Sequence, residues 1–226
     1  MPEKLPQTIV FDLDGTLVDT APDLAAALNA VLIGQRLPEV SLDEVRHMVG
    51  RGARVLIERA MAAHGVTLTE RRTEDLMQHF LVHYEANIAA TSRPFDGVVT
   101  QVRALADWGH RIGICTNKPV ALSHKLLAEL GLTSLFPVVL GADSRPWRKP
   151  DPRHLFDTIA ELGGTPNDAV MVGDSETDSL TAQAAGIPCI LVTFGYTEKP
   201  VRDLGANALI DHYRDLPAAL ALCARA

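Results

Sequence analysis

The stretch Thr8-Ile9-Val10-Phe11-Asp12-Leu13-Asp14-Gly15-Thr16 decides what kind of fold this chain forms. Its first four residues are β-branched or aromatic, a run typical of a strand buried on both faces of a sheet. The run ends in two carboxylates, Asp12 and Asp14, and an extended backbone directs both to one side. Gly15 permits the tight turn that follows. Because ligands of open α/β sheets bind where strands end, these residues predict a site at this point.

The two carboxylates constrain the chemistry of that site. Carboxylates this close repel each other, so a stable fold keeps both only where a cation lies between them or one carries a proton. The pair therefore indicates a metal-assisted catalytic site.

The composition excludes several classes of protein. With 226 residues, 47% of them hydrophobic, the chain can form one large domain or one domain with a modest insertion. A net charge of −7, with a single short basic segment at 145–149, argues against a nucleic-acid partner. The sequence has no run of about 18 apolar residues and no signal peptide, so we expect no membrane association. The three cysteines are odd in number and favour reduced thiols, which predicts a cytoplasmic location.

Strand-like apolar runs alternate with helix-like segments over the second half of the chain. The segments 120–130, 152–162 and 178–185 have helical length and lie between successive runs. This alternation predicts an α/β fold: a doubly wound, Rossmann-like parallel sheet with helices on both faces. The expected strands are Thr8–Phe11, Arg111–Cys115, Val138–Leu140, Ala169–Val172, Cys189–Val192 and Ala208–Ile210.

A long gap without strand signals separates the first two expected strands. Residues 21–90 are too many for an ordinary crossover connection, whose loops are short. We therefore expect a catalytic core domain made of 1–20 and 91–226, and a helical cap domain over 21–90 that is inserted after the first strand. The expected cap helices are 22–33, 42–49, 53–64 and 70–88.

Further polar residues follow the expected strands. Thr116 and Asn117 follow the second strand, Lys149 precedes a proline and a helix, and Asp174 and Asp178 lie beyond a later strand. If they meet the first two acids, the site holds four acids and one lysine, a formal charge of −3 that repels anions. The acids therefore predict a hard metal ion of the Mg²⁺ kind, bound through oxygen. With the lysine, the threonine and backbone N–H groups beside it, the expected ligand is a phosphate.

These segments together resemble the motifs of the haloacid dehalogenase superfamily. Four motifs occur in that family's order and cover essentially the whole chain. They are Phe-Asp-Leu-Asp-Gly-Thr at 11–16, a threonine after the second strand, a lysine before Pro150, and Gly-Asp-x-x-x-Asp at 173–178.

The resemblance implies a catalytic role for four residues. Asp12 would be the nucleophile that forms an aspartyl-phosphate. Asp14 would protonate the leaving oxygen and then deprotonate the attacking water. Thr116 and Lys149 would hold the phosphoryl oxygens. The family's dehalogenases lack an aspartate at the position of Asp14, so the resemblance implies phosphoester hydrolysis.

The resemblance also implies how the metal is held. Mg²⁺ would be bound by Asp12, Asp174 and the backbone carbonyl of Asp14. Asp178 would support the metal site or Lys149 without touching the ion.

Shorter segments resemble the phosphoglycolate phosphatase group of the superfamily. This finer resemblance implies hydrolysis of 2-phosphoglycolate to glycolate and phosphate. The carboxylate of that substrate needs a partner, for which Arg51 in the cap is the candidate, and Asn117 is a further candidate for substrate binding. The residues at 145–148, which directly precede Lys149, and the residue Thr177 depart from the group's usual pattern. The resemblance therefore determines the substrate less well than the reaction. The matching segments are 17–24, 49–53, 115–119, 173–175 and 194–196.

Two alternatives to this function stay open. A phosphosugar phosphatase or a phosphomutase of the same superfamily would carry the same motifs. A phosphometabolite-binding protein without catalysis would keep the fold, although loss of Asp12 or Asp14 would be its expected mark. We expect a monomer or a homodimer in each case.

Other interpretations of single features are weaker. A calcium loop starting at Asp12 would need a glutamate where Asp23 stands and a glycine at its sixth position, whereas Gly15 occupies the fourth. The glycines at 50 and 52 lack the preceding strand and third glycine of a dinucleotide loop. His79 and His83 have helical spacing but no third zinc ligand, and Cys115 lies in an apolar strand, which favours core packing.

Overall fold

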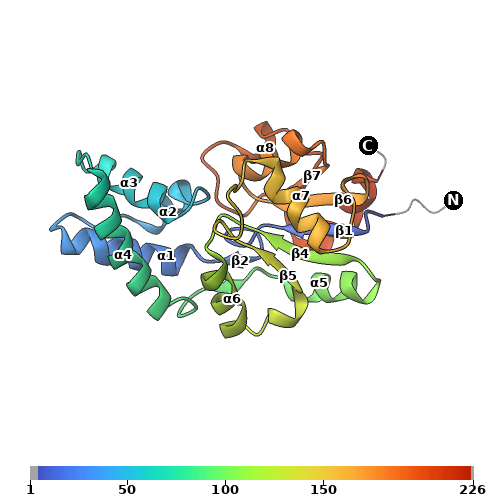
Figure 1. The fold of residues 1–226 in the computed structure, drawn as a ribbon, viewed down its shortest axis with the longest axis horizontal. Helices are drawn as coiled ribbons and strands as arrows, with labels where there is room; N and C mark the ends of the chain where they lie inside the picture. Colours follow the sequence, from blue (N-terminus) through green and yellow to red (C-terminus); the bar gives the residue numbers. More distant parts are fainter. Residues whose placement is uncertain (1–4, 225–226) are drawn as a thin grey trace.

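The computed structural model describes residues 5–224, which form a six-stranded sheet flanked by helices (Figure 1). The strands are β1 (Thr8–Phe11), β4 (Arg111–Cys115), β5 (Val138–Leu140), β6 (Ala169–Gly173), β7 (Cys189–Val192) and β8 (Ala208–Ile210). Their order is β5-β4-β1-β6-β7-β8, and every neighbouring pair is parallel. The predicted doubly wound parallel sheet is confirmed. None of the helices within 5–224 has both the length and the apolar character that a bilayer crossing requires.

Both faces of the sheet are covered, as the apolar run of β1 predicts. Ile9 and Phe11 pack in one cluster, which includes residues of the helices α5 (Val98–Asp107), α6 (Val120–Glu129) and α9 (Leu216–Cys223). Val10 packs in a second cluster with residues of α7 (Pro152–Glu161) and α8 (Glu176–Ala185). Alternate side chains of one strand thus enter opposite layers.

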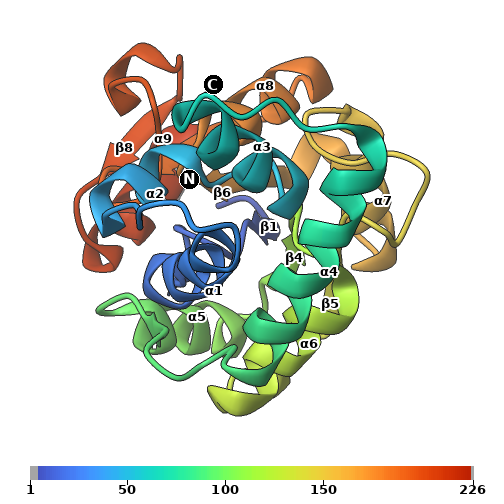
Figure 2. The ribbon, with the colours of Figure 1, turned by 90° about the vertical axis from the view of Figure 1, so that its left-hand side faces the viewer.

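Four further helices occupy the long gap after β1 and lie beyond one end of the sheet (Figures 1 and 2). They pack on one another, and Ser41 and Thr69 cap the second and the last of them. Each boundary lies within two residues of its expected place. The division into a core domain and a cap domain stays a prediction. The helices are α1 (Ala21–Gly34), α2 (Leu42–Met48), α3 (Ala53–Ala63) and α4 (Glu70–Ala86).

The chain enters and leaves these four helices through a small antiparallel ribbon. The strands β2 (Val18–Asp19) and β3 (Arg93–Pro94) pair side by side, although 75 residues separate Val18 from its partner Pro94. The buried Asp23 carboxylate joins the same two segments: it accepts hydrogen bonds from the backbone N–H groups of Thr91 at 3.0 Å and Ser92 at 2.8 Å. The sequence patterns predicted neither this ribbon nor α5 and α9.

Candidate active site

The strand register brings the expected site residues together. Phe11, the last residue of β1, pairs with Ile114 of β4 and Val172 of β6, so these three neighbouring strands end at nearly the same level. The residues that follow them, including Asp12, Thr116 and Asp174, therefore meet at one edge of the sheet.

Lys149 links two of the predicted carboxylates. It is buried, and its Nζ lies 3.0 Å from Asp12 Oδ1 and 2.6 Å from Asp178 Oδ1. The other oxygen of Asp178 accepts hydrogen bonds from the backbone N–H groups of Asp174 and Ser175 and from the Ser175 hydroxyl. Both oxygens of Asp178 are thus occupied by donors, and its carboxylate fixes Lys149 and the start of α8.

Three buried carboxylates form a cluster that fits a metal ion. One oxygen each of Asp12, Asp174 and Asp178 lies within 4.8 Å of the other two. Burial raises the pKa of Asp12 to about 6, with Lys149 opposing the rise and Asp178 adding to it. Burial and then repulsion from Asp178 and Asp12 hold the pKa of Asp174 well above its ordinary value. Carboxylate oxygens suit hard divalent cations, and a cation here would relieve both effects. Asp178 accepts four hydrogen bonds, whereas each oxygen of Asp174 accepts one, so Asp12 and Asp174 are the residues that keep lone pairs for an ion.

Gly15 makes room for the Asp174 carboxylate. Thr16 Oγ1 donates to Asp174 Oδ1 at 2.9 Å, and the backbone N–H of Tyr196 donates to Oδ2 at 2.6 Å. A Cβ on Gly15 would lie 2.3 Å from Oδ2, and the backbone φ of Gly15 is +82°. Only glycine therefore permits this approach without displacing Asp174.

A second lysine, which the sequence analysis did not single out, neutralises Asp14. Lys118 Nζ donates to the two oxygens of Asp14 at 3.1 and 3.2 Å and to the Tyr84 hydroxyl at 2.7 Å. Burial acts to lower the pKa of Lys118, but the Asp14 charge and the Tyr84 hydroxyl outweigh it and raise the pKa. Burial also raises the pKa of Tyr84 to about 12, so its hydroxyl keeps its proton at neutral pH. With both lysines counted, the four acids and two lysines carry a formal charge of −2, which one divalent cation balances.

Thr116 and Asn117 lie where β4 ends, and both line the cavity beside Asp12. Thr116 is buried, and its Oγ1 accepts the backbone N–H of Lys118 at 3.2 Å. The Asn117 amide donates to the backbone carbonyls of Lys149 at 3.1 Å and Gly50 at 3.5 Å. In this structure Asn117 therefore ties two loops together at the edge of the cavity.

Arg51 lies away from the carboxylate cluster. Its guanidinium is half exposed and pairs with Glu176 at 3.4 Å, at the start of α8. Its neighbours Gly50 and Gly52 line the cavity that contains Asp12, whereas Arg51 is not among the described residues of that lining. The sequence-based role of Arg51 in carboxylate binding stays a prediction.

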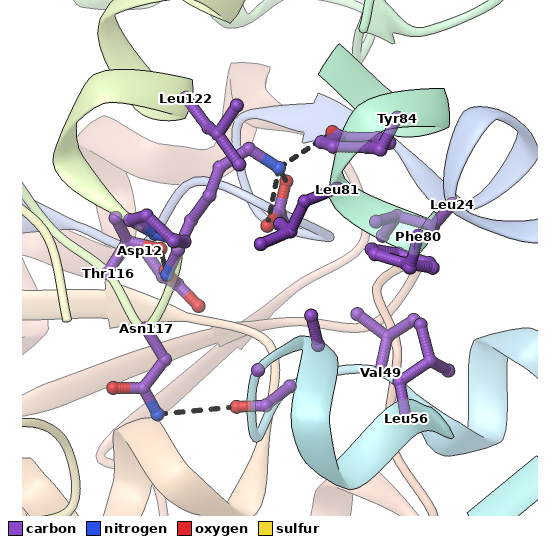
Figure 3. Close-up of a pocket in the computed structure, with 16 residues that line it drawn as sticks. Asp12, Leu24, Val49, Leu56, Phe80, Leu81, Tyr84, Thr116, Asn117 and Leu122 are labelled. Carbon is purple, nitrogen blue, oxygen red and sulfur yellow. Dashed lines mark hydrogen bonds and ion pairs between the residues drawn. The ribbon is translucent and has the colours of Figure 1, made fainter. Parts of the chain in front are cut away.

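The cavity lies between the strand ends and the four inserted helices (Figure 3). Its volume is about 50 Å³. On this measure one water molecule needs about 10–15 Å³, so the cavity as it stands admits only a few small groups. Beyond the polar residues its wall is apolar. It comes mainly from Leu24, Leu56, Phe80 and Leu81 of the inserted helices, with Val49 just after α2 and Leu122 from α6.

Comparison with known proteins places this geometry in a family. The model of the haloacid dehalogenase-like hydrolase family matches residues 9–192. The chain is 50% identical to the phosphoglycolate phosphatase of Caulobacter vibrioides, covering 94% of this chain and 90% of that protein. It is 47% identical to the phosphoglycolate phosphatase of Mesorhizobium japonicum, with 94% of each chain covered.

A solved structure agrees with the sequence relatives. The crystal structure of a predicted phosphoglycolate phosphatase from Haemophilus somnus superposes with a TM-score of 0.87 at 31% identity, covering 94% of this chain and 96% of that one. The chain therefore belongs to the haloacid dehalogenase-like hydrolase family and, like its relatives named phosphoglycolate phosphatase, is a phosphoric monoester hydrolase.

Proposed function

We propose that this hydrolase is a Mg²⁺-dependent phosphatase that cleaves 2-phosphoglycolate to glycolate and phosphate through an aspartyl-phosphate on Asp12. The observation that carries the proposal is the buried cluster of Asp12, Asp174 and Asp178, with Lys149 bonded to the first and last of them. The relatives supply the choice of substrate.

Lys149 prepares Asp12 to attack phosphorus. The pKa of Asp12, at about 6, lies below 7, so the carboxylate is ionised in most molecules at neutral pH. Lys149 fixes one of its oxygens, while Asp178 prevents Lys149 from moving. The other Asp12 oxygen forms the bond to phosphorus as the bond from phosphorus to the ester oxygen breaks.

Asp14 manages the protons of both steps. In the first step Asp14, in its protonated form, gives its proton to the departing ester oxygen and is left as a carboxylate. In the second step this carboxylate takes a proton from the water that attacks the phosphorus of the aspartyl-phosphate, which restores the protonated form. The second attack releases phosphate and restores the Asp12 carboxylate. Thr116 and Lys149 would hold the phosphoryl oxygens meanwhile.

Asp12 and Asp174 would hold the magnesium ion, and the Asp14 carbonyl stays the predicted third protein ligand. When bound, the ion supplies positive charge that polarises a phosphoryl oxygen and offsets the carboxylates. Without such charge the site would repel the substrate it is proposed to bind.

The test is phosphate release from a panel of small phosphoesters that includes 2-phosphoglycolate and a sugar phosphate, with Mg²⁺ or with a chelator. We expect 2-phosphoglycolate to have the highest kcat/KM and the chelator to abolish turnover. Asp12→Asn should lower kcat by about 10⁴-fold or more, in line with removal of other catalytic nucleophiles. Asp107→Asn is the control, because Asp107 is exposed at the end of α5.

Three results would contradict the proposal. Release of no phosphate from any ester would remove the function. Full activity of Asp12→Asn would remove the covalent step, and faster transfer to a labelled sugar phosphate than to water would identify a phosphomutase.

A further inference from the structure

We propose that Lys118 and Tyr84 form the subsite that binds the carboxylate end of the substrate. This inference rests on the proposed function and assigns its substrate selectivity to two residues that the family motifs leave without a role.

Lys118 offers a counterion for a carboxylate in the cavity. Among the described residues that line it, Lys118 has the only cationic side chain. The wall also carries Asp12 and Asp14, so a substrate carboxylate adds a further negative charge to a buried space. Placing that charge in an apolar wall without a cation would be costly. The exposed Arg51, bound to Glu176, lies outside this wall.

The subsite and the phosphoryl end of the cavity are separate. Lys149 bonds to Asp12, whereas Lys118 bonds to Asp14 and Tyr84. Figure 3 shows Asp12 and Tyr84 well apart around the cavity. A short ester with its phosphoryl group at Asp12 can therefore extend its acid group toward Lys118 and Tyr84.

The donors of the pair match a carboxylate. An ammonium group has three N–H donors, and Lys118 directs them to the two oxygens of Asp14 and to the Tyr84 hydroxyl. Because the hydroxyl accepts from Lys118, its own hydrogen remains available to an incoming oxygen. A substrate carboxylate would share Lys118 with Asp14 and accept from Tyr84.

Tyr84 also makes the subsite depend on the inserted helices. Lys118 lies between β4 and α6, whereas Tyr84 belongs to α4. Lys118 Nζ lies 4.4 Å from the centre of the Tyr84 ring, so the ring's face adds to the hydrogen bond. The carboxylate site is thus complete only when α4 lies over the strand ends.

The experiment compares 2-phosphoglycolate with ethyl phosphate, which has the same two-carbon skeleton and a methyl group in place of the carboxylate. The selectivity is kcat/KM for 2-phosphoglycolate divided by kcat/KM for ethyl phosphate. We expect Lys118→Met to reduce this ratio by about 10–100-fold, the effect of losing a hydrogen bond to a charged group. Tyr84→Phe should reduce the ratio by about 2–10-fold, mainly through KM for 2-phosphoglycolate.

Lys125→Met is the matched control. Lys125 is also a lysine near α4, because its Nζ donates to the backbone carbonyl of Glu85 at 2.8 Å, but it lies outside the described cavity lining. Its loss should leave the ratio of the two esters unchanged. If Lys118→Met does not fold, Tyr84→Phe keeps the ring and carries the test.

The outcomes separate the two proposals. If the Lys118 and Tyr84 variants lose both esters by equal factors or lose neither, the subsite is overturned while phosphatase activity stands. If the wild-type protein shows no preference for 2-phosphoglycolate over ethyl phosphate, the subsite is likewise overturned. If the wild-type protein releases phosphate from neither ester, the proposed function and the subsite both fall.

Discussion

Asp12 and Asp174 are carboxylates that the fold holds in an unfavourable environment. Burial raises the pKa of both, and repulsion from Asp178 adds to each rise. A protein retains such groups where a cation or a proton compensates them. These two residues therefore connect protein stability, metal binding and pH.

We predict that Mg²⁺ stabilises the protein more at pH 7.5 than at pH 5. Between the ordinary pKa of 3.8 and about 6, Asp12 binds more protons in the folded than in the unfolded chain, so metal-free stability falls as pH rises through this window. Ion binding needs deprotonated carboxylates, so the gain from Mg²⁺ grows over the same window. Thermal unfolding with and without Mg²⁺ at both pH values measures it.

The ion should add about 2.7 kcal/mol at a concentration of 100 times Kd. Asp174→Asn is the control, because it removes one of the two carboxylates and should lose most of the gain. If Mg²⁺ raised the melting temperature equally at both pH values, the predicted coupling between Mg²⁺ binding and deprotonation of the carboxylates would be contradicted.

We predict that Gly15→Ala removes metal binding and activity while Gly34→Ala preserves both. The new methyl group at position 15 would lie 2.3 Å from Asp174 Oδ2, whereas a Cβ on Gly34 meets nothing within 4 Å. Gly34 ends α1, where alanine should stabilise the helix by about 0.5–1 kcal/mol. Mg²⁺ titration calorimetry and urea unfolding of the two variants give the comparison. Normal Mg²⁺ affinity of Gly15→Ala would show that Asp174 adapts.

How far the site could be predicted depended on whether its residues belong to a local pattern. Asp12 and Asp174 follow apolar strands, and this position is visible in the sequence. Lys118 also follows a strand, but nothing local distinguishes it from a solvated lysine. Its partner Tyr84 lies 34 residues earlier in a helix, and only tertiary packing brings the two together.

Whether a helix or strand could be predicted also depended on how clearly a local sequence pattern marks it. All six main strands were predicted to within one residue. Of these, β1, β6 and β7 are continuous buried runs, whereas β8 exposes Leu209. The ribbon strands β2 and β3 have two residues each, which is too short for any periodicity, and their pairing depends on a contact across the whole helical insertion. Helix α9 is apolar along most of its length and so shows little helical periodicity. Helix α5 does bury one face, formed by Val98, Val102 and Leu105, and was missed in spite of that pattern.

We predict that Asp23→Ala destabilises the protein by about 3 kcal/mol. Asp23 lies in the first turn of α1, and its carboxylate accepts hydrogen bonds from Thr91 and Ser92 in the segment that leads to β3. Hydrogen bonds to charged groups contribute about 1.5–3 kcal/mol, and removal of the carboxylate leaves the buried donors of Ser92 without partners. Urea unfolding measures the loss, with Asp75→Ala on the exposed face of α4 as control.

The stability lost in Asp23→Ala should also depend on pH. Burial acts to raise the pKa of Asp23, but the hydrogen bonds from Ser92 and Thr91 outweigh it and lower the pKa. The stabilisation is therefore present above the unfolded pKa of 3.8 and is lost as pH falls below it. A difference between wild type and variant that stayed constant down to pH 3 would contradict this assignment.

On the scale of the whole molecule, the contacts that close the cavity are weak ion pairs at its exposed edge. They surround a small buried contact between Lys118 and Tyr84. Ion pairs at the rim connect the inserted helices to the sheet side: Arg46 with Asp19, Arg51 with Glu176, and Arg59 with Glu198. All are partly exposed, and such pairs contribute about 0–1 kcal/mol each. We therefore expect the helices to separate from the strand ends when substrate enters a cavity of about 50 Å³, at the cost of these pairs and of the buried contact between Lys118 and Tyr84.

We predict that a covalent link between an inserted helix and the sheet side slows turnover by about 10-fold or more, because opening of the cavity then limits substrate entry and product release. Cysteines at positions 59 and 198 would be joined by a cleavable bis-maleimide, and the three native cysteines are buried. Steady-state kcat before joining, after joining and after cleavage is the measurement. The single-cysteine variants treated alike are the controls, and an unchanged kcat would show that catalysis does not need this movement.

The ribbon of β2 and β3 has a consequence for how such an enzyme can diversify. Because the polypeptide departs and returns at adjacent positions, Val18 beside Pro94, everything between them is spliced into the fold at a single point. Swapping that portion for another helical module would leave the six-stranded scaffold and Asp12 undisturbed while replacing Tyr84. Selectivity could thus be inherited separately from reactivity, and a chimera that exchanges residues 20–92 with a relative would carry over the donor's preference among phosphoesters.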